Sequence, residues 1–119
     1  MGIAIPKEVE DLGQLYEIEV NAIEFLAYND HLIPFLQEMA PVLASYFPGS
    51  PLRLHLERDP ETGREMELWA LAIWRDGNDG WMEALERLDR FRREWWFHNS
   101  SSVRRQLAVN FQFAEVQTP

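Results

Sequence analysis

The chain has 119 residues, a formal net charge of −9 and no cysteine, which fits one domain large enough to bury a core without disulfides. The missing cysteines exclude zinc–thiolate sites and thiol nucleophiles, and the acidic total disfavours general binding to nucleic acids or anionic membranes. No apolar run approaches the roughly 20 residues of a membrane span, and the N-terminus lacks the regions of a secretory signal, so we expect a cytoplasmic location.

Two helices are predicted in the first part of the chain, after a loose arm at residues 1–6. Apolar residues recur every three or four positions over residues 7–28 and again up to residue 47, as on one side of an amphipathic helix. The Asn29-Asp30 pair separates the two helices. Pro41 is expected to kink or split the second helix, because proline cannot donate a main-chain hydrogen bond.

A β-hairpin is predicted next. Residues 52–58 alternate between apolar and polar side chains, as in a strand with one buried face. Residues 59–63 contain the proline and glycine of a tight turn. Residues 64–74 are apolar on both faces in their second half, so both faces of this strand must be covered.

The clearest helix lies at residues 79–97, and Asn78 or Asp79 can cap its start. Three acidic residues each precede an arginine by four positions, an arrangement that adds about 0.2–0.5 kcal/mol per pair. Its apolar stripe, which we expect to be buried, consists of Trp81, Ala84, Leu85, Leu88, Phe91 and Trp95. Residues 106–116 then alternate cleanly and predict a last strand.

These elements predict an α+β fold in the order ααββαβ. We predict one domain over residues 1–119, with a helical part at 7–47 and a ββαβ core at 52–116. The sheet is predicted to have three antiparallel strands in the order 2-1-3, packed by the helix at residues 79–97. The two N-terminal helices then cover the other face of the sheet or lie in a dimer interface.

The D-P-E-T-G turn, the segment ALERLDRFRREWWF and the alternating C-terminal strand together resemble small uncharacterised prokaryotic α+β proteins. The resemblance covers roughly residues 52–116, and its motifs are not specific. It implies the ββαβ core and no activity.

Acidic residues dominate the first half of the chain, where residues 1–50 contain eight acids and one base, for a charge of −7. Glu17, Glu24, His31 and Glu38 are spaced by seven, and such a set on one unbroken helix can hold metal ions. We favour a solvated acidic face, because the predicted break after residue 28 divides the set.

His55 stands beside Glu57, with Glu65 and Glu67 on the partner strand, and an imidazole near carboxylates can act as a general base. We favour an exposed cross-strand charge cluster instead. Residues 76–87 lack calcium ligands at the fifth and twelfth loop positions, and the serines after His98 lack a nucleophile elbow. We therefore assign no catalytic, metal-binding or cofactor-binding residue.

Arginines and aromatic residues lie close together between residues 87 and 105, where six arginines and two acids give +4. Such a mixture can hold single-stranded nucleic acid, but we favour ion pairs within the helix and core packing, because the net charge of −9 argues against a long phosphate track. Trp95 and Trp96 are adjacent on one helix and cannot both face one core, so Trp96 needs another apolar surface, which a second copy or the first two helices of the same chain can supply. The candidates for an interface or a ligand pocket are Trp69, Trp74, Trp95, Trp96, Phe97, Arg92 and Arg93.

The sequence favours a small non-enzymatic protein-interaction module that forms a homodimer and needs no cofactor. Its acidic N-terminal half, with Glu17, Glu24 and Glu38, suggests a basic protein partner, as for an antitoxin or inhibitor. The alternative is a small-molecule-binding protein with an aromatic-lined pocket. Nucleic-acid contact through the 87–105 region ranks third.

Overall fold

The computed structural model describes residues 7–58, 61–62, 65–74 and 80–114. Their helices and strands follow in the order α1 (Lys7–Leu12), β1 (Glu17–Ile18), α2 (Val20–Tyr28), α3 (Leu32–Tyr46), β2 (Leu52–Arg58), β3 (Glu65–Trp74), α4 (Gly80–Phe91), the π-helical turn η1 (Arg92–Trp96), α5 (Phe97–Asn99) and β4 (Leu107–Phe113). The fold is α+β, as predicted. The arm at residues 1–6 and the capping residues Asn78 and Asp79 lie outside the described residues.

The sheet has four strands in the order β1-β2-β3-β4, so the predicted three-stranded antiparallel sheet is wrong. β2 and β3 form the expected antiparallel hairpin, whereas β1 pairs with β2 and β4 pairs with β3 in parallel. In the predicted order 2-1-3, the strand at residues 64–74, which is β3 in the structure, would have been an edge strand. A strand that is apolar on both faces is better satisfied at the centre, and parallel pairing with β4 places it there.

The single helix predicted for residues 7–28 is also wrong, because this segment contains α1, β1 and α2. The chain leaves the helix at Gly13, a residue that costs about 1 kcal/mol in a helix relative to alanine. The buried Tyr16 hydroxyl then donates to the Leu36 carbonyl at 2.8 Å, and Ile18 pairs with Leu54 of β2. Contacts with distant residues therefore outweigh the local helical pattern. α3 continues through Pro41 without the predicted split.

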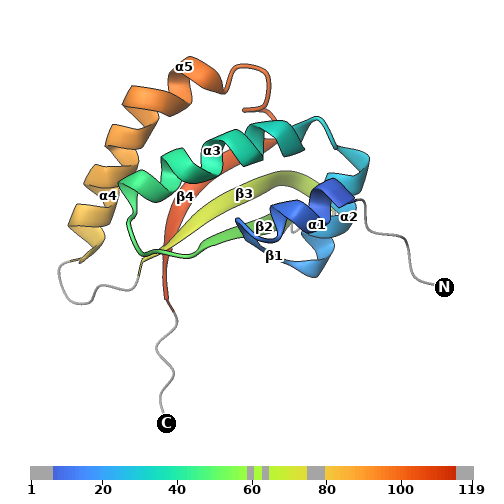
Figure 1. The fold of residues 1–119 in the computed structure, drawn as a ribbon, viewed down its shortest axis with the longest axis horizontal. Coiled ribbons are helices and arrows are strands. Elements are labelled where there is room, and N and C mark those ends of the chain that lie inside the picture. Colours follow the sequence, from blue (N-terminus) through green and yellow to red (C-terminus); the bar gives the residue numbers. More distant parts are fainter. Residues whose placement is uncertain (1–6, 59–60, 63–64, 75–79, 115–119) are drawn as a thin grey trace, which may run out of the picture.

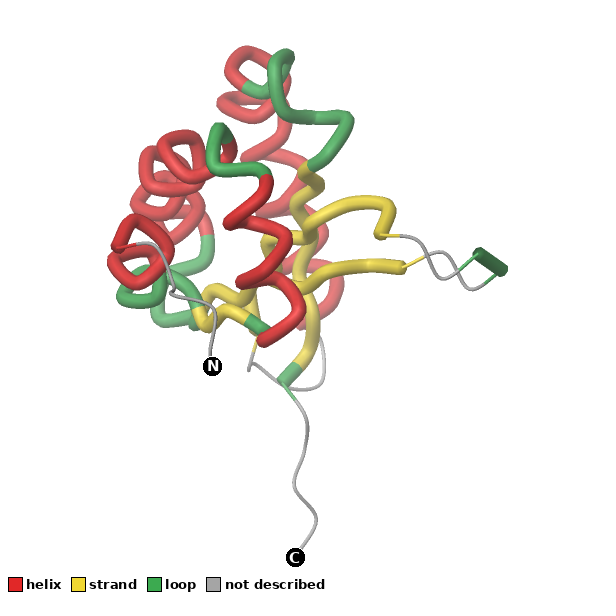
Figure 2. Tube along the Cα trace, turned by 90° about the vertical axis from the view of Figure 1, so that its right-hand side faces the viewer, coloured by secondary structure: helices red, strands yellow, loops and turns green. Residues whose placement is uncertain are grey.

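All the larger helices pack against one face of the sheet, which corrects the prediction that the N-terminal helices lie on the other face or in a dimer interface. The buried cluster joins α1 and α2 to α3, α4 and η1 over the side chains of Leu54, Ala70 and Ala72. Figure 1 shows α1 and α3 crossing in front of the strands, and Figure 2 shows the ends of β2 and β3 extending away from the helical layer. The alternate side chains of β2, which include Arg53 and His55, lie on the outer face.

The predicted helix at 79–97 is present, but a π-helical turn interrupts it at Arg92–Trp96. In such a turn the hydrogen bonds join residues five apart. Trp95 and Trp96 consequently both reach Phe91, with ring centroids at 5.7 and 6.5 Å, and both reach Phe35 of α3, at 5.4 and 5.9 Å. The expectation that the two tryptophans need separate surfaces is wrong.

Candidate interaction surface

Three large apolar side chains are exposed together on α4. Trp81, Met82 and Leu85 expose 53%, 58% and 45% of their surface, and we call them the α4 patch. Residues three and four apart are neighbours on a helix, so the three side chains form one continuous surface. The side of α4 that faces the core is formed by Ala84, Leu88 and Phe91. The helix therefore has two apolar sides, and the prediction that Trp81 and Leu85 are buried is wrong.

The α4 patch is exposed because α3 ends before it could cover this part of α4. Tyr46, the last residue of α3, packs its ring against Phe91 at 5.6 Å, and its carbonyl accepts a hydrogen bond from Arg87 Nη1 at 3.0 Å. Phe35, three residues from the other end of α3, packs against Trp95. α3 thus covers the helical segment from Arg87 onward. The first turns of α4, which carry the patch, lie before this covered segment.

Beneath these first turns, Trp74 fixes the start of α4. Its ring lies next to Gly80, where a Cβ atom would overlap the indole Nε1. Phe47 meets the same ring edge-on at 6.0 Å, and the Arg87 guanidinium lies 5.6 Å from its centre. Trp74 is therefore part of the core and is not available as the interface residue that the sequence suggested.

The outer edge of β4 is partly capped by side chains and by the preceding turn. The Leu68 N–H of β3 donates to the Gln106 carbonyl, and the Ala114 N–H donates to the Trp74 carbonyl of β3, so the main-chain groups of the odd-numbered residues of β4 point away from the sheet. Arg92 Nη2 donates to the Val109 carbonyl at 2.9 Å, and the Phe111 N–H donates to Asn110 Oδ1 at 2.8 Å. Such caps discourage pairing with another strand. Arg92, predicted to lie in an interface, closes this edge.

The other predicted interface residues are divided between the core and separate surfaces. Trp96 is buried and Trp95 is half-buried, whereas Phe97 on α5 is 54% exposed. Trp69 lies half-buried on the outer face of the sheet. Arg93 pairs with Asp89 on the exposed side of α4.

The sequence could have shown the α4 patch by the width of its apolar arc. At about 100° per residue, the arc runs from Phe91 through Trp81 and Leu85 to Met82 and covers roughly 180°. A helix that packs against one core needs a narrower apolar arc. The part of the arc beyond that width therefore indicates a second contact surface.

On the outer face of the sheet, His55 is held between two carboxylates. Its Nδ1 lies 2.9 Å from both oxygens of Glu19, and its Nε2 lies 3.0 Å from Glu57 Oε2. The hydrogen bond with Glu19 raises the pKa of His55, and the bond with Glu57 adds to this effect. Both ring nitrogens are engaged by carboxylates, so neither is free to take a proton from a substrate, which argues against a general base. Beside this group Arg53 pairs with Glu17 at 3.5 Å.

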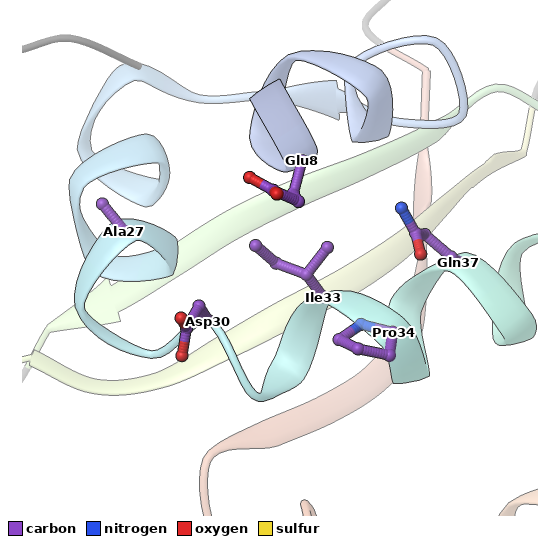
Figure 3. Close-up of a pocket in the computed structure, with 6 residues that line it drawn as sticks. All are labelled: Glu8, Ala27, Asp30, Ile33, Pro34 and Gln37. Carbon is purple, nitrogen blue, oxygen red and sulfur yellow. The ribbon is translucent and has the colours of Figure 1, made fainter. Parts of the chain in front are cut away.

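The acidic residues do not share one helix face. Glu17 is in β1, Glu24 is in α2 and Glu38 is in α3. An open pocket of about 250 Å³ lies between the helices and is shown in Figure 3. Its lining contains no aromatic residue and consists of Glu8, Ala27, Asp30, Ile33, Pro34 and Gln37. This pocket therefore gives no support to the predicted aromatic-lined ligand site.

The arginines between residues 87 and 105 are mostly engaged within the chain. Arg87, Arg90 and Arg93 pair with acids four residues earlier, at 2.8, 3.6 and 3.1 Å. Arg104 donates to the Phe97 carbonyl at 3.3 Å. Most of these arginines therefore have a partner within the chain.

Within the part of the chain that the structure describes, no three His, Asp or Glu side chains are placed to hold a metal ion. In the same residues, no helix has both the length and the apolar character needed to cross a bilayer. Comparisons of the chain with protein-family models, with curated proteins and with solved structures find no match.

Proposed function

We propose that this chain is a small cytosolic, non-enzymatic protein-interaction module that works as a homodimer. The α4 patch is the observation that carries this proposal. Exposed apolar residues scattered singly are normal on a monomer, whereas contiguous ones mark contact surfaces. Tryptophan and methionine are also among the residues enriched in interfaces.

Sedimentation velocity over a wide range of protein concentrations tests the proposal. The expected result is a monomer–dimer equilibrium that Leu85→Glu shifts towards the monomer, because an interface would bury the introduced charge without a partner. Val20→Glu is the matched control, since Val20 is 84% exposed at the start of α2, away from the patch. A wild-type protein that stays monomeric at every concentration would refute the homodimer.

A basic protein partner is a second proposal, and the charges of the first three helices favour it. Glu17 and Glu19 are paired with Arg53 and His55 of β2. The remaining acids have no ion-pair partner among the described residues: Glu8, Glu10, Asp11, Glu24, Asp30 and Glu38. These unpaired acids suit the antitoxin- or inhibitor-like role suggested by the sequence.

Fluorescence anisotropy with a labelled arginine-rich peptide tests the second proposal. Binding should weaken as salt is added and should weaken further in the Glu24→Gln/Glu38→Gln double variant. The control variant is Glu86→Gln/Asp89→Gln, which removes two acids from α4. Equal affinity of both variants for the peptide would rule out a specific role of the N-terminal acids.

A further inference from the structure

The charges along α4 and η1 are unevenly distributed. From residue 80 to residue 86 the chain contains two acids, Glu83 and Glu86, and no base. From residue 87 to residue 93 it contains four arginines and one aspartate, for +3. A second copy of this segment is therefore complementary in charge when it runs in the opposite direction, and it is not complementary when it runs in the same direction.

The exposed ion pairs of α4 do not prevent such a contact. Arg90 and Glu86 have 49% and 71% of their side chains exposed, and Arg93 and Asp89 have 65% and 64%. Pairs of this kind contribute about 0–1 kcal/mol each. They can exchange an intramolecular partner for one on another chain at little cost.

The α4 patch is too small to form a standard interface without the residues around it. A standard interface buries roughly 800 Å² per partner, and three half-exposed side chains provide only part of that area. The remaining area must come from the charged residues that follow on the same side of α4. When a second copy of α4 packs in the opposite direction, the apolar residues of the α4 patch and the charged residues that follow them lie in one interface.

The edge of β4 is a less suitable contact. Strand pairing across it would displace Arg92 from the Val109 carbonyl and Asn110 from the Phe111 N–H. Contact through α4 leaves both hydrogen bonds in place.

We infer that the homodimer forms by antiparallel packing of α4 on α4 of a second copy, about a twofold axis at Leu85. This inference rests on the homodimer proposed above and specifies its interface. An axis at Leu85 places Trp81 of one copy opposite Asp89 of the other, within reach of the Arg93 guanidinium. Arginine over an indole ring is an attractive contact, and one axis produces it twice.

The absence of cysteine from the chain permits a direct test by disulfide cross-linking. Two copies of a residue on a twofold axis lie close enough for the Cα separation of about 4.4–6.8 Å that a disulfide needs. Most of a Leu85→Cys variant should therefore convert to a covalent dimer on mild oxidation. Val20→Cys is the control on α2, and Gln112→Cys, exposed on β4, reports strand pairing instead. Both should remain monomeric under the same conditions on a denaturing gel.

A mixed experiment tests the register. Trp81→Cys and Asp89→Cys should form a mixed disulfide when combined, and each should cross-link less when alone. Circular dichroism verifies that every variant is folded.

The outcomes separate the two proposals. If sedimentation shows a dimer but Leu85→Cys does not cross-link, or if Gln112→Cys does so instead, the α4 interface is wrong and the homodimer remains. If the wild-type protein is a monomer, both proposals fail. If Leu85→Cys cross-links and the mixed pair does not, the twofold axis is elsewhere and the inferred register is wrong.

Discussion

Both halves of the helical segment from Gly80 to Asn99 contain large apolar residues, but the two halves bury them differently. In the second half, Phe91 is fully buried and Trp96 is 7% exposed. In the first half, Trp81 and Leu85 are about half exposed. The contrast follows from α3, whose Phe35 and Tyr46 pack against Trp95 and Phe91 of the second half.

The contrast shows which aromatic residues hold the fold together and which are free for other contacts. Phe91, Trp95 and Trp96 form one cluster with Phe35, and the π-helical turn makes this cluster possible by bringing two adjacent indoles to one side. Among the residues that the structure describes, no equivalent cover lies over the α4 patch. Substitutions in the two halves should therefore affect different properties, stability in one case and association in the other.

The largest expected effect is that of Phe91→Ala. Phe91 is fully buried and contacts the rings of Tyr46, Trp95 and Trp96, so its truncation should lower the free energy of unfolding by about 3–5 kcal/mol. Leu85→Ala is the matched substitution in the exposed half and should change the unfolding free energy of the monomer by no more than about 0.5 kcal/mol. Urea denaturation at a protein concentration below the dimer range measures both. Similar losses in the two variants would show that the halves do not differ as described.

An intermediate effect is expected at the start of α4, where the exposed half is anchored. An alanine at position 80 would place its Cβ against the Trp74 indole, which cannot move away freely because Phe47 and Arg87 pack on it. Gly80→Ala should therefore destabilise the protein by about 1–3 kcal/mol.

A double-mutant cycle identifies the cause of that loss. The overlapping atoms belong to the five-membered part of the indole, which phenylalanine lacks. Gly80→Ala should thus cost less in a Trp74→Phe background than in the wild type. An equal cost in both backgrounds would mean that the close approach to Trp74 is not what requires glycine.

The same contrast explains how much of this molecule could be predicted from its sequence. Local patterns were sufficient for the α+β class, for the β2–β3 hairpin and for the helical segment after residue 79, because periodicity and turn residues act over a few positions. They failed for β1, whose two residues form a strand only because Leu54 lies beside Ile18. The order of the strands likewise depends on long-range pairing.

The site was less predictable than the fold. Periodicity assigns Trp81 and Leu85 to the core, and only the end of α3 decides that they are exposed. Trp95 and Trp96 were predicted to need separate surfaces, because no local pattern signals the π-helical turn. The role of Arg92 at the edge of β4 also depends on a contact across 17 positions.

The smallest expected effect lies at His55 on the outer face of the sheet, which is held by polar contacts. His55 bonds to Glu19 beside β1 and to Glu57 on its own strand, and these bonds raise its pKa above the ordinary value of 6.5. Below that value the imidazole is protonated in the folded and unfolded states, and its contribution to stability is complete. As the pH rises through the raised pKa, the folded state loses the proton and the contribution disappears.

His55→Gln should therefore be less stable than the wild type at about pH 6, by no more than about 1 kcal/mol because the group is partly exposed, and the difference should shrink by about pH 9. Urea denaturation at a series of pH values measures this difference. His31→Gln is the control, since His31 bonds to the neutral Gln106 amide at 2.6 Å. If the difference in unfolding free energy between His55→Gln and the wild type stays constant with pH, the bond between His55 and Glu19 beside β1 does not depend on the charge of the imidazole. The outer face would then be as insensitive to charge as the aromatic cluster around Phe91.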